Sequence, residues 1–237
     1  MLTALVLPAL LAVSCRGGSA SDRKQTPAGA SPRLTPSEFT ATITHPLFPL
    51  SSIPTTVFEG EEREPRRGTT IRTRAEKRVL GTTSQVAGVE VAVVEVKEYE
   101  DGELVERTLD YFAQHRDGSV WYLGERVDEY EDGKVVGHEG QWLAGEKGAS
   151  PGLFMPAEPK VGQTFEQERA PGVAEDRSTV VSDHVSVTTP AGSFTDCIKT
   201  EDFAPLDKVT ELKHYCPGVG LVREEFQGGT LDLVRYR

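Results

Sequence analysis

The sequence predicts an all-β protein: a large antiparallel meander that forms a strongly curved sheet or an open or closed barrel, with little helix. Three Asp-Gly pairs, Asp101-Gly102, Asp117-Gly118 and Asp132-Gly133, each lie between runs of Val, Tyr, Trp and Leu. Asp-Gly favours the positive φ angles of tight hairpin turns. Residues 89–93 read Val-Glu-Val-Ala-Val, the period of two of a half-buried strand. Pro and Gly recur too often for a long helix.

A short internal repeat favours the meander. The sequence EYEDG at 98–102 recurs at 129–133, and YFA at 111–113 aligns with WLA at 142–144. Two copies are too few for a solenoid, so we interpret them as one hairpin type used twice. Ala191-Gly192 and Gly228-Gly229 predict two more turns.

Length and charge limit the domain count and the partners. The chain has 237 residues, enough for one β domain and a tail. It carries 37 Asp and Glu against 26 Lys and Arg, a formal net charge of −11. Nucleic acid is therefore excluded as an expected partner, and an anionic membrane would repel the domain unless something anchors it.

The N-terminal residues predict such an anchor. Residues 1–13 are apolar apart from Thr3 and Pro8, too short a run for a transmembrane helix but the length of a signal-peptide core. They end in Ala12-Val13-Ser14-Cys15, which resembles a bacterial lipobox, with Ala12 where leucine is usual. The resemblance implies that residues 1–14 are removed and that Cys15 is lipidated. The alternative is an ordinary secretory signal with a chance cysteine.

The domain organisation and location follow from that reading. Residues 15–44 are rich in Gly, Ser, Pro, Ala and Thr, so we expect a lipid anchor and disordered tether there. Residues 45–237 are expected to form a single β-rich domain. The expected location is outside the cytoplasm, anchored to a membrane by lipid. Arg16 after the lipid site implies an outer membrane and its periplasmic face in a Gram-negative host, and the cell surface otherwise.

The two remaining cysteines predict a disulfide. Cys197 and Cys216 are equidistant from a centre between Leu206 and Asp207, within the expected turn 204–208. In an antiparallel hairpin they would face each other across the strands. A redox-active pair is the alternative, but it lacks the C-x-x-C spacing.

Five blocks of sequence together resemble a loosely defined group of exported bacterial β-rich proteins and lipoproteins with no assigned activity. The blocks are DYFAQ (110–114), GSVWYLGE (118–125), PGLFMP (151–156), APGVAED (170–176) and YCPGVGLV (215–222). The resemblance implies an antiparallel β fold similar to that of open-barrel lipoprotein carriers, which shelter acyl chains. It brings no catalytic residues with it.

No motif predicts a reaction, a metal or a cofactor. The five histidines form no H-E-x-x-H pattern or zinc-ligand spacing, and there is no G-x-S-x-G elbow or phosphate loop. The acidic runs 98–103 and 128–132 lack calcium-loop spacing. We therefore expect a protein that is not an enzyme. Carboxylates are numerous enough that a hydrolytic pair would escape notice.

The aromatic residues are the candidate binding site. Those of the meander and of the Pro/Gly-bounded segment after it would pack in the core, or line an apolar cavity inside the curved sheet. The candidate ligand-binding residues are Tyr111, Trp121, Tyr122, Trp142, Phe154 and Met155.

Three functions remain open. The first is a noncatalytic binding module for a hydrophobic ligand or an envelope protein. The second is a structural or interaction lipoprotein without a small-molecule pocket. The third is an unrecognised carboxylate-based hydrolase.

Overall fold

The computed structural model describes residues 35–63 and 68–237. One 3₁₀ turn, η1 (Pro36–Glu38), precedes fifteen strands. The strands are β1 (Phe39–Thr40), β2 (Thr55–Arg63), β3 (Thr70–Val86), β4 (Val89–Glu100), β5 (Glu103–His115), β6 (Val120–Glu131), β7 (Lys134–Gly137), β8 (Trp142–Leu143), β9 (Gly152–Met155), β10 (Thr164–Glu166), β11 (Arg177–Thr189), β12 (Gly192–Ala204), β13 (Val209–Cys216), β14 (Gly220–Phe226) and β15 (Gly229–Tyr236).

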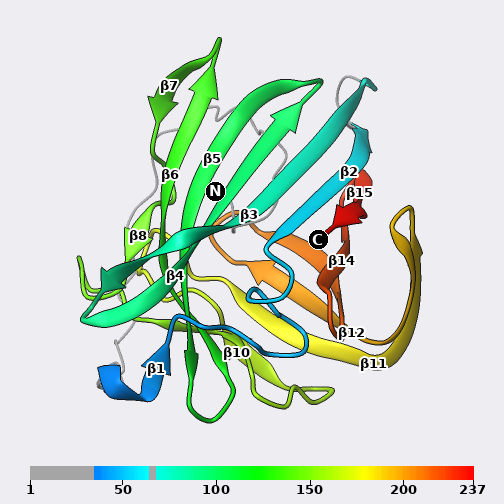
Figure 1. Ribbon diagram of the computed structural model, residues 1–237. Coiled ribbons are helices and arrows are strands. Elements are labelled where there is room, and N and C mark those ends of the chain that lie inside the picture. Colours follow the sequence, from blue (N-terminus) through cyan, green and yellow to red (C-terminus); the bar gives the residue numbers. More distant parts are fainter. Residues whose placement is uncertain (1–34, 64–67) are drawn as a thin grey trace, which may run out of the picture.

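All fifteen strands belong to one antiparallel sheet that curves strongly around its own core (Figure 1). Its order is β10-β11-β12-β13-β14-β15-β2-β3-β4-β5-β6-β7, with β1 paired to β5 and with β8 and β9 paired to β6. The last strand, β15, therefore pairs with β2 and joins the two ends of the chain. Because β10 and β7 end the path without pairing, the sheet is open. The predicted fold class is confirmed in its strongly curved, open form.

The predicted hairpin turns form where Asp-Gly pairs occur. Asp101 and Gly102 have φ angles of 49° and 94°, and Asp132 and Gly133 have 50° and 71°. Two successive positive φ angles make the turn that matches the twist of a tight hairpin. At the third pair only Gly118 has a positive φ, 98°. There the Asp117 carboxylate accepts a hydrogen bond from the Ser119 backbone N–H at 2.8 Å.

The predicted cysteine hairpin is also present. In the hairpin of β12 and β13, Ile198 lies opposite Tyr215. The centre of the hairpin therefore lies between Leu206 and Asp207, as the cysteine spacing predicts. Cys197 and Cys216 form a disulfide with their Cα atoms 4.1 Å apart. The bond links β12 to the end of β13.

The segment between β1 and β2, residues 41–54, crosses the concave side of the sheet. We call it the plug segment. Ile43, Phe48 and Leu50 are each at most 3% exposed, and they belong to the main hydrophobic core. The backbone N–H of Gly218, between β13 and β14, donates to the carbonyl of Pro46, and Nε2 of the adjacent His45 lies 3.0 Å from the carbonyl of Pro156, which follows β9. The plug segment thus connects the two walls of the curved sheet.

Residues 35–44, the last part of the expected tether, include η1, β1 and the buried Ile43. Strand β1 pairs with the end of β5, and the ring of Phe39 lies 6.4 Å from that of Trp121. Folded structure therefore begins ahead of residue 45. The expected signal, residues 1–14, and Cys15 lie outside the described residues.

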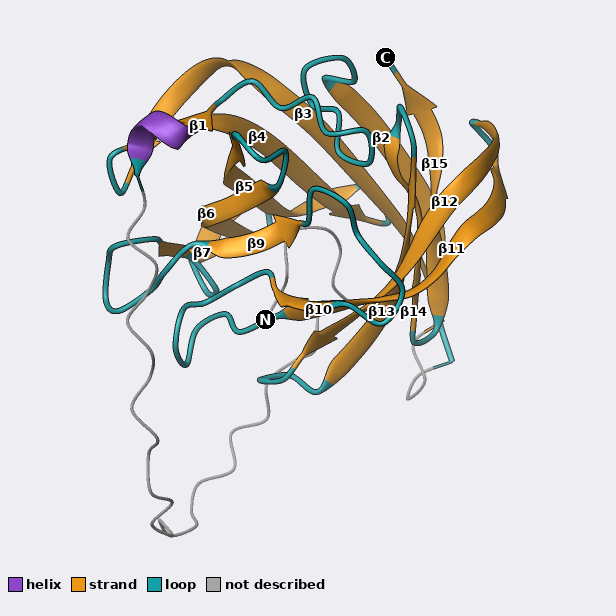
Figure 2. Cartoon of the chain, turned by 90° about the horizontal axis from the view of Figure 1, so that it is seen from below, coloured by secondary structure: helices purple, strands orange, loops and turns teal. Residues whose placement is uncertain are grey.

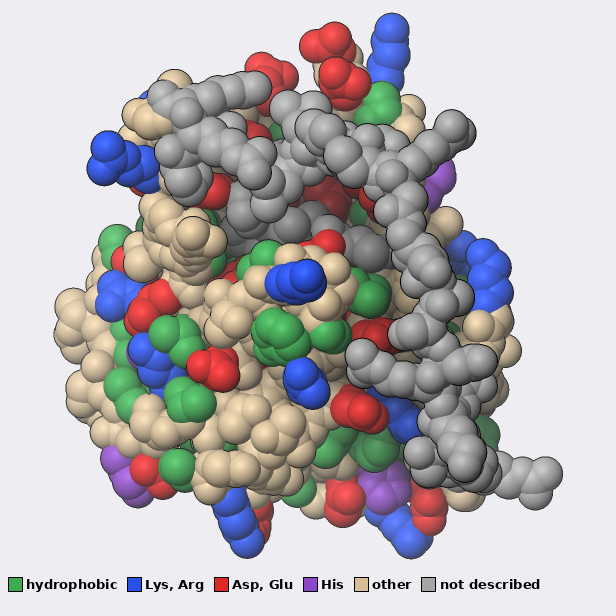
Figure 3. All heavy atoms as spheres, turned by 180° about the vertical axis from the view of Figure 1, so that it is seen from behind, with side chains coloured by type: hydrophobic (Ala, Val, Ile, Leu, Met, Phe, Trp, Pro, Cys, Tyr) green, Lys and Arg blue, Asp and Glu red, His purple; other side chains and the backbone are tan. Residues whose placement is uncertain are grey.

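Seen from below, β4, β5 and β6 lie on one side of the concavity and β11 to β14 on the other (Figure 2). On the outer face shown in Figure 3, basic and acidic side chains are interspersed with hydrophobic ones. No helix in ranges 35–63 and 68–237 is long and apolar enough to cross a membrane.

Candidate functional site

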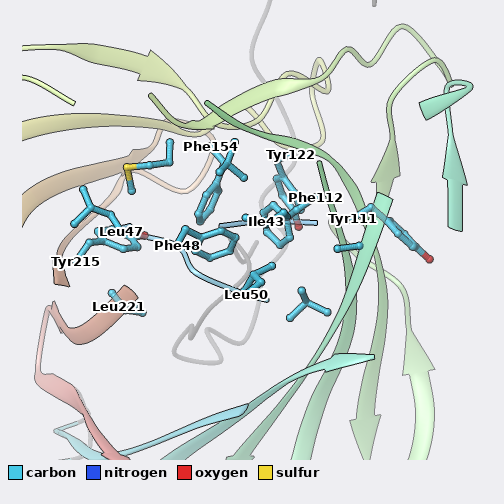
Figure 4. Close-up of a cluster of buried hydrophobic side chains, with 14 of the residues drawn as sticks. Ile43, Leu47, Phe48, Leu50, Tyr111, Phe112, Tyr122, Phe154, Tyr215 and Leu221 are labelled. Carbon is cyan, nitrogen blue, oxygen red and sulfur yellow. The ribbon is translucent and has the colours of Figure 1, made fainter. Parts of the chain in front are cut away.

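Aromatic rings from three parts of the chain meet on the concave side (Figure 4). Phe48 of the plug segment lies 5.0 Å from Phe112 of β5 and 4.6 Å from Phe154 of β9, measured between ring centroids. Tyr122 of β6 stacks on Phe112 at 4.7 Å. Trp142 of β8 meets Tyr122 edge-on at 5.4 Å. We call these five residues the aromatic cluster.

The aromatic cluster brings together three of the six candidate binding residues, Tyr122, Trp142 and Phe154. Met155 is fully buried in β9 beside Phe154. Tyr111 points away from the cluster in Figure 4, because neighbours on a strand face opposite sides. Trp121 packs on Phe39 instead, and its indole N–H donates to Ser119 at 3.0 Å. A role of these six residues in ligand binding stays a prediction.

The place of Trp142 depends on Gly124. A Cβ on Gly124 would lie 2.3 Å from the carbonyl oxygen of Trp142, and the residue has a φ of +124°. Only glycine tolerates both conditions. Strand β8 can therefore approach β6 closely, with Trp142 directly opposite Glu125.

Carboxylates are buried beside the aromatic cluster. Asp110 of β5 pairs across the sheet with Glu125 of β6, and both are 1% exposed. Glu106 lies four residues before Asp110 on the same strand face, and Glu168 follows β10. We call Glu106, Asp110, Glu125 and Glu168 the carboxylate cluster. Fully buried acidic residues are rare unless they are paired.

Buried acids outnumber buried lysines among the described residues. Ten acidic side chains are buried, against two lysines, Lys77 and Lys213. The acidic ones are Glu62, Glu98, Glu106, Asp110, Glu125, Glu168, Asp176, Asp202, Glu211 and Glu224. Lys77 Nζ lies 5.1 Å from the ring centroid of Phe48 and interacts electrostatically with Asp110. Lys213 Nζ lies 3.3 Å from both Asp202 and Glu211.

Burial dominates the electrostatics of the carboxylate cluster. Burial raises the pKa of Asp110 to about 7, against the opposing effects of a hydrogen bond from Tyr122 and of Lys77. Burial, with help from Glu98 and Glu129, raises the pKa of Glu106 to about 9. Burial and then the mutual repulsion of Glu125 and its neighbour Glu168 raise the pKa of Glu125 well above its ordinary value. A cation placed here would lower these pKa values by favouring the charged forms.

Several oxygens of the buried acids lack a hydrogen-bond donor among the described residues. They are both carboxylate oxygens of Glu125, both of Glu224, both of Asp202 and one of Glu168. The hydroxyl of Tyr122 is near Glu125, but it donates to Asp110 at 2.8 Å. The indole Nε1 of Trp142 is also buried without an acceptor. Buried polar groups without partners destabilise a fold, and where they occur in a native structure they call for an explanation.

No group of three or more His, Cys, Asp or Glu within residues 35–63 and 68–237 is arranged to hold a metal ion. The disulfide of Cys197 and Cys216 lies on the opposite wall and takes no part in the cluster.

A groove of about 790 Å³ lies elsewhere, along the outer face of β2 and β3. Its charged side chains mostly pair with one another. Arg74 contacts Glu59 and Glu76, Arg72 lies 3.7 Å from Asp101, and Asp232 accepts from Arg223. The groove therefore offers few free groups to a ligand.

Sequence reasoning missed the carboxylate cluster and the plug segment. The sequence does indicate a strand here, because Glu106, Thr108 and Asp110 alternate with Arg107 and Leu109. The pattern does not say which face is buried, because both faces carry polar residues. Phe48 stood at the expected domain start, where nothing predicted that it would enter the core.

Comparisons with known proteins add little to this geometry. No protein-family model matches the chain, and no curated protein matches it either. A similar solved structure is the crystal structure of a protein from Parabacteroides distasonis ATCC 8503 that is provisionally described as a lipoprotein. It is 13% identical, and the match covers 84% of this chain and 100% of that chain with a TM-score of 0.42. A likeness this weak does not establish function, which has to come from the residues of this chain.

Proposed function

We propose that this protein is a noncatalytic binding module of the bacterial cell envelope, held at a membrane by a lipid on Cys15. Its ligand is an amphiphile with a cationic group, bound on the concave side of the curved sheet. The observation that carries the proposal is the carboxylate cluster beside the aromatic cluster. In it, both oxygens of Glu125 and one of Glu168 have no hydrogen-bond donor among the described residues.

The charge balance supports a cationic ligand. Without a ligand, burial keeps Glu106 and Glu125 protonated, as their raised pKa values indicate. A cation bound beside them would favour the ionised form and gain from it. Lys77 interacts electrostatically with Asp110, but no donor within residues 35–63 and 68–237 reaches either oxygen of Glu125. A ligand ammonium or guanidinium would supply the donors and the charge together.

The aromatic cluster supports an apolar portion of the same ligand. Tyr122 and Trp142 belong to the aromatic cluster and lie next to Glu125 in β6 and β8. Such rings bury large apolar areas and also attract cations over their faces. Phe48 already fills the space between Phe112 and Phe154, so the ligand's apolar part is expected nearer Trp142.

Native mass spectrometry tests this proposal. The full chain with Cys15→Ala, which cannot be lipidated, is purified from an envelope fraction without detergent. We expect added mass that is lost on denaturation and that belongs to an amine-containing amphiphile. A bare polypeptide mass would overturn the proposal and favour a structural lipoprotein without a small-molecule ligand.

A carboxylate-based hydrolase is the second candidate. It is favoured by the raised pKa values of Glu125 and Glu168, since a protonated carboxyl can act as a general acid. Incubation with envelope glycans would then release products, and Glu125→Gln would abolish the release. The binding module predicts no product from either protein.

A further inference from the structure

A small cavity lies at the edge of the sheet, beside the pair of β6 and β8. Its volume is about 160 Å³, and two loops, residues 145–149 and 170–174, form its wall together with these strands. A cavity of about 150 Å³ accommodates a benzene-sized molecule. The space therefore suits a ligand of a few heavy atoms.

Backbone hydrogen bonds hold the loops around the cavity. The N–H of Gly145 donates to the carbonyl of Ala149 at 2.9 Å and closes the first loop. The N–H of Ser150 donates to the carbonyl of Arg169 at 2.9 Å and joins the first loop to the second. The wall is therefore formed without a ligand, so binding requires little ordering of the loops.

Exposed side chains supply the polar groups that a ligand can reach. Arg126, Gln141, Glu146 and Lys147 all line the cavity and are exposed. Glu125 also lines it but is 1% exposed, so its carboxyl group offers almost no surface to a ligand. The accessible charges are therefore two positive ones, on Arg126 and Lys147, and the opposing one on Glu146.

The two cations are free to bind an anion. Neither Arg126 nor Lys147 forms an ion pair within residues 35–63 and 68–237, whereas Arg107 on the same sheet lies 2.8 Å from Glu95. Continuing the β6–β8 register by one residue places Arg126 opposite Gln141, whose side-chain amide is a further donor. The accessible groups therefore combine positive charge with neutral donors.

Lys147 has a backbone conformation that lysine rarely adopts. Its φ angle is 47°, and that of Gly148 is 85°. Glycine, asparagine and aspartate are the residues that commonly occupy this left-handed region. Strained conformations cluster at ligand-binding sites. The strained position of Lys147 beside the cavity is therefore a second observation that points to a ligand.

The rest of the wall is apolar. Leu143 and Val173 are half-buried, so a short hydrocarbon can pack against them. The apolar lining residues are Trp142, Leu143, Ala149, Ala170, Pro171 and Val173.

We propose that this cavity binds a small carboxylate anion with a short hydrocarbon part. The planar guanidinium of Arg126 would donate to the carboxylate, because its geometry matches that group, and Lys147 would add a second positive charge. The hydrocarbon would contact Leu143 and Val173. This ligand is opposite in charge to the cationic amphiphile, so the inference goes beyond the proposed function and does not rest on it.

Three probes of similar shape test the sign of the charge. Butyrate, butanol and butylamine are titrated into the full chain carrying Cys15→Ala, and binding is measured by saturation transfer in ligand-observed NMR. Butyrate is expected to bind saturably and at least about tenfold more tightly than either of the others. Equal affinities of the three probes would overturn the inference, because the cations would then take no part.

Inorganic phosphate tests the hydrocarbon part. It is an anion without carbon, so it should displace butyrate only at a concentration at least about tenfold higher than a competing carboxylate of the same length requires. Displacement at equal concentration would overturn the assignment to a carboxylate with a hydrocarbon part.

Charge variants identify the residues responsible. Arg126→Met should weaken butyrate binding at least about tenfold. Lys147→Asn should also weaken it, and it preserves the test if Arg126→Met folds poorly, because asparagine tolerates a positive φ. Glu146→Gln should strengthen binding by removing the opposing charge. Lys208→Asn is the matched control, since Lys208 is an exposed lysine with a φ of 60° outside the cavity, and it should leave the affinity unchanged.

The variants can also contradict the inference. Undiminished affinity in both Arg126→Met and Lys147→Asn, or weaker binding by Glu146→Gln, would overturn it, as would a parent protein that does not bind butyrate.

A fourth probe identifies the source of the carboxylate. If N-acetylalanine binds at least as tightly as butyrate, the carboxylate is that of a peptide C-terminus. If butyrate binds and N-acetylalanine does not, the ligand is a free short-chain acid.

Discussion

At the residue scale, this protein places acidic side chains where apolar ones would stabilise the sheet more. Asp110 and Glu125 face each other on the buried side of β5 and β6, beside Phe112 and Tyr122. Replacement of buried charges by apolar residues is often neutral or stabilising, and active or binding sites commonly sacrifice stability for function. The carboxylate cluster fits that pattern.

Stability should fall as pH rises from 7 to 8. Glu106 keeps its proton in the folded state up to a pKa of about 9 because it is buried, whereas in the unfolded chain it ionises near its ordinary value. The folded state therefore binds more protons in this window, and the free energy of unfolding decreases, by up to about 1.4 kcal/mol per pH unit for each such group. Burial lowers the pKa values of His45 and His214, so their titration changes the stability below pH 7. Burial lowers the pKa of Lys77 to about 8, so its titration changes the stability mainly above pH 8.

Urea unfolding at pH 7.0, 7.5 and 8.0 measures this dependence. Glu106→Gln removes one titrating proton and should reduce the slope. Stability that rises with pH over the same interval would show that the carboxylate cluster is ionised at neutral pH.

Gly124 should be sensitive to a single methyl group. Gly124→Ala places a Cβ 2.3 Å from the Trp142 carbonyl in a backbone conformation that alanine disfavours, so we expect a loss of about 2 kcal/mol or more. Gly81→Ala is the matched control, because a Cβ there meets nothing within 4 Å and no positive φ is required. Thermal unfolding compares the two; an equally small effect of both would mean that β8 does not depend on this close approach.

At the element scale, the hairpins could be predicted from the sequence and the plug segment could not. Asp-Gly turns act locally, and the cysteine spacing fixed the β12–β13 register through a two-residue period. Which face of a strand lies on the concave side depends on the curvature of the whole sheet. The burial of Glu106 and Asp110 therefore could not be predicted from the sequence. The path of residues 41–54 depends on contacts with β5, β9 and the 217–220 turn, all far away in sequence.

Phe48 should contribute more to stability than any exposed position. Its ring contacts Phe112 and Phe154 and lies under Lys77 Nζ, and the residue is 3% exposed. Phe48→Ala is expected to lower the free energy of unfolding by about 3 to 5 kcal/mol. Val136→Ala, at a position that is 60% exposed in β7, should change it little. Urea denaturation measures the free energy of unfolding of both variants. If Phe48→Ala lost less of it than Val136→Ala, the plug segment would not be part of the cooperative core.

At the scale of the whole molecule, we propose that a lipid on Cys15 would present the open sheet at a membrane. The sheet could have closed into a barrel, but β7 and β10 leave it open. The concave side is instead crossed by the plug segment, whose Ile43, Phe48 and Leu50 belong to the main hydrophobic core.

The anchor is tested separately from the ligand. Cys15→Ala should abolish incorporation of labelled palmitate and release the protein from membranes, because the lipid supplies the membrane affinity that a net charge of −11 opposes. Cys197→Ala and Cys216→Ala together should leave labelling unchanged. Continued labelling of Cys15→Ala would refute the lipoprotein assignment.

The central claim is that the buried carboxylates serve ligand binding at a cost in stability. The most direct measurement is the free energy of unfolding of the ligand-free protein and of Glu125→Gln, by urea denaturation at pH 8. If the claim holds, Glu125→Gln is as stable as the parent or more stable, because a buried acid without donors is removed. If Glu125→Gln is destabilised by about 3 kcal/mol, as when one partner of a buried ion pair is lost, Glu125 is a structural residue and the claim is contradicted.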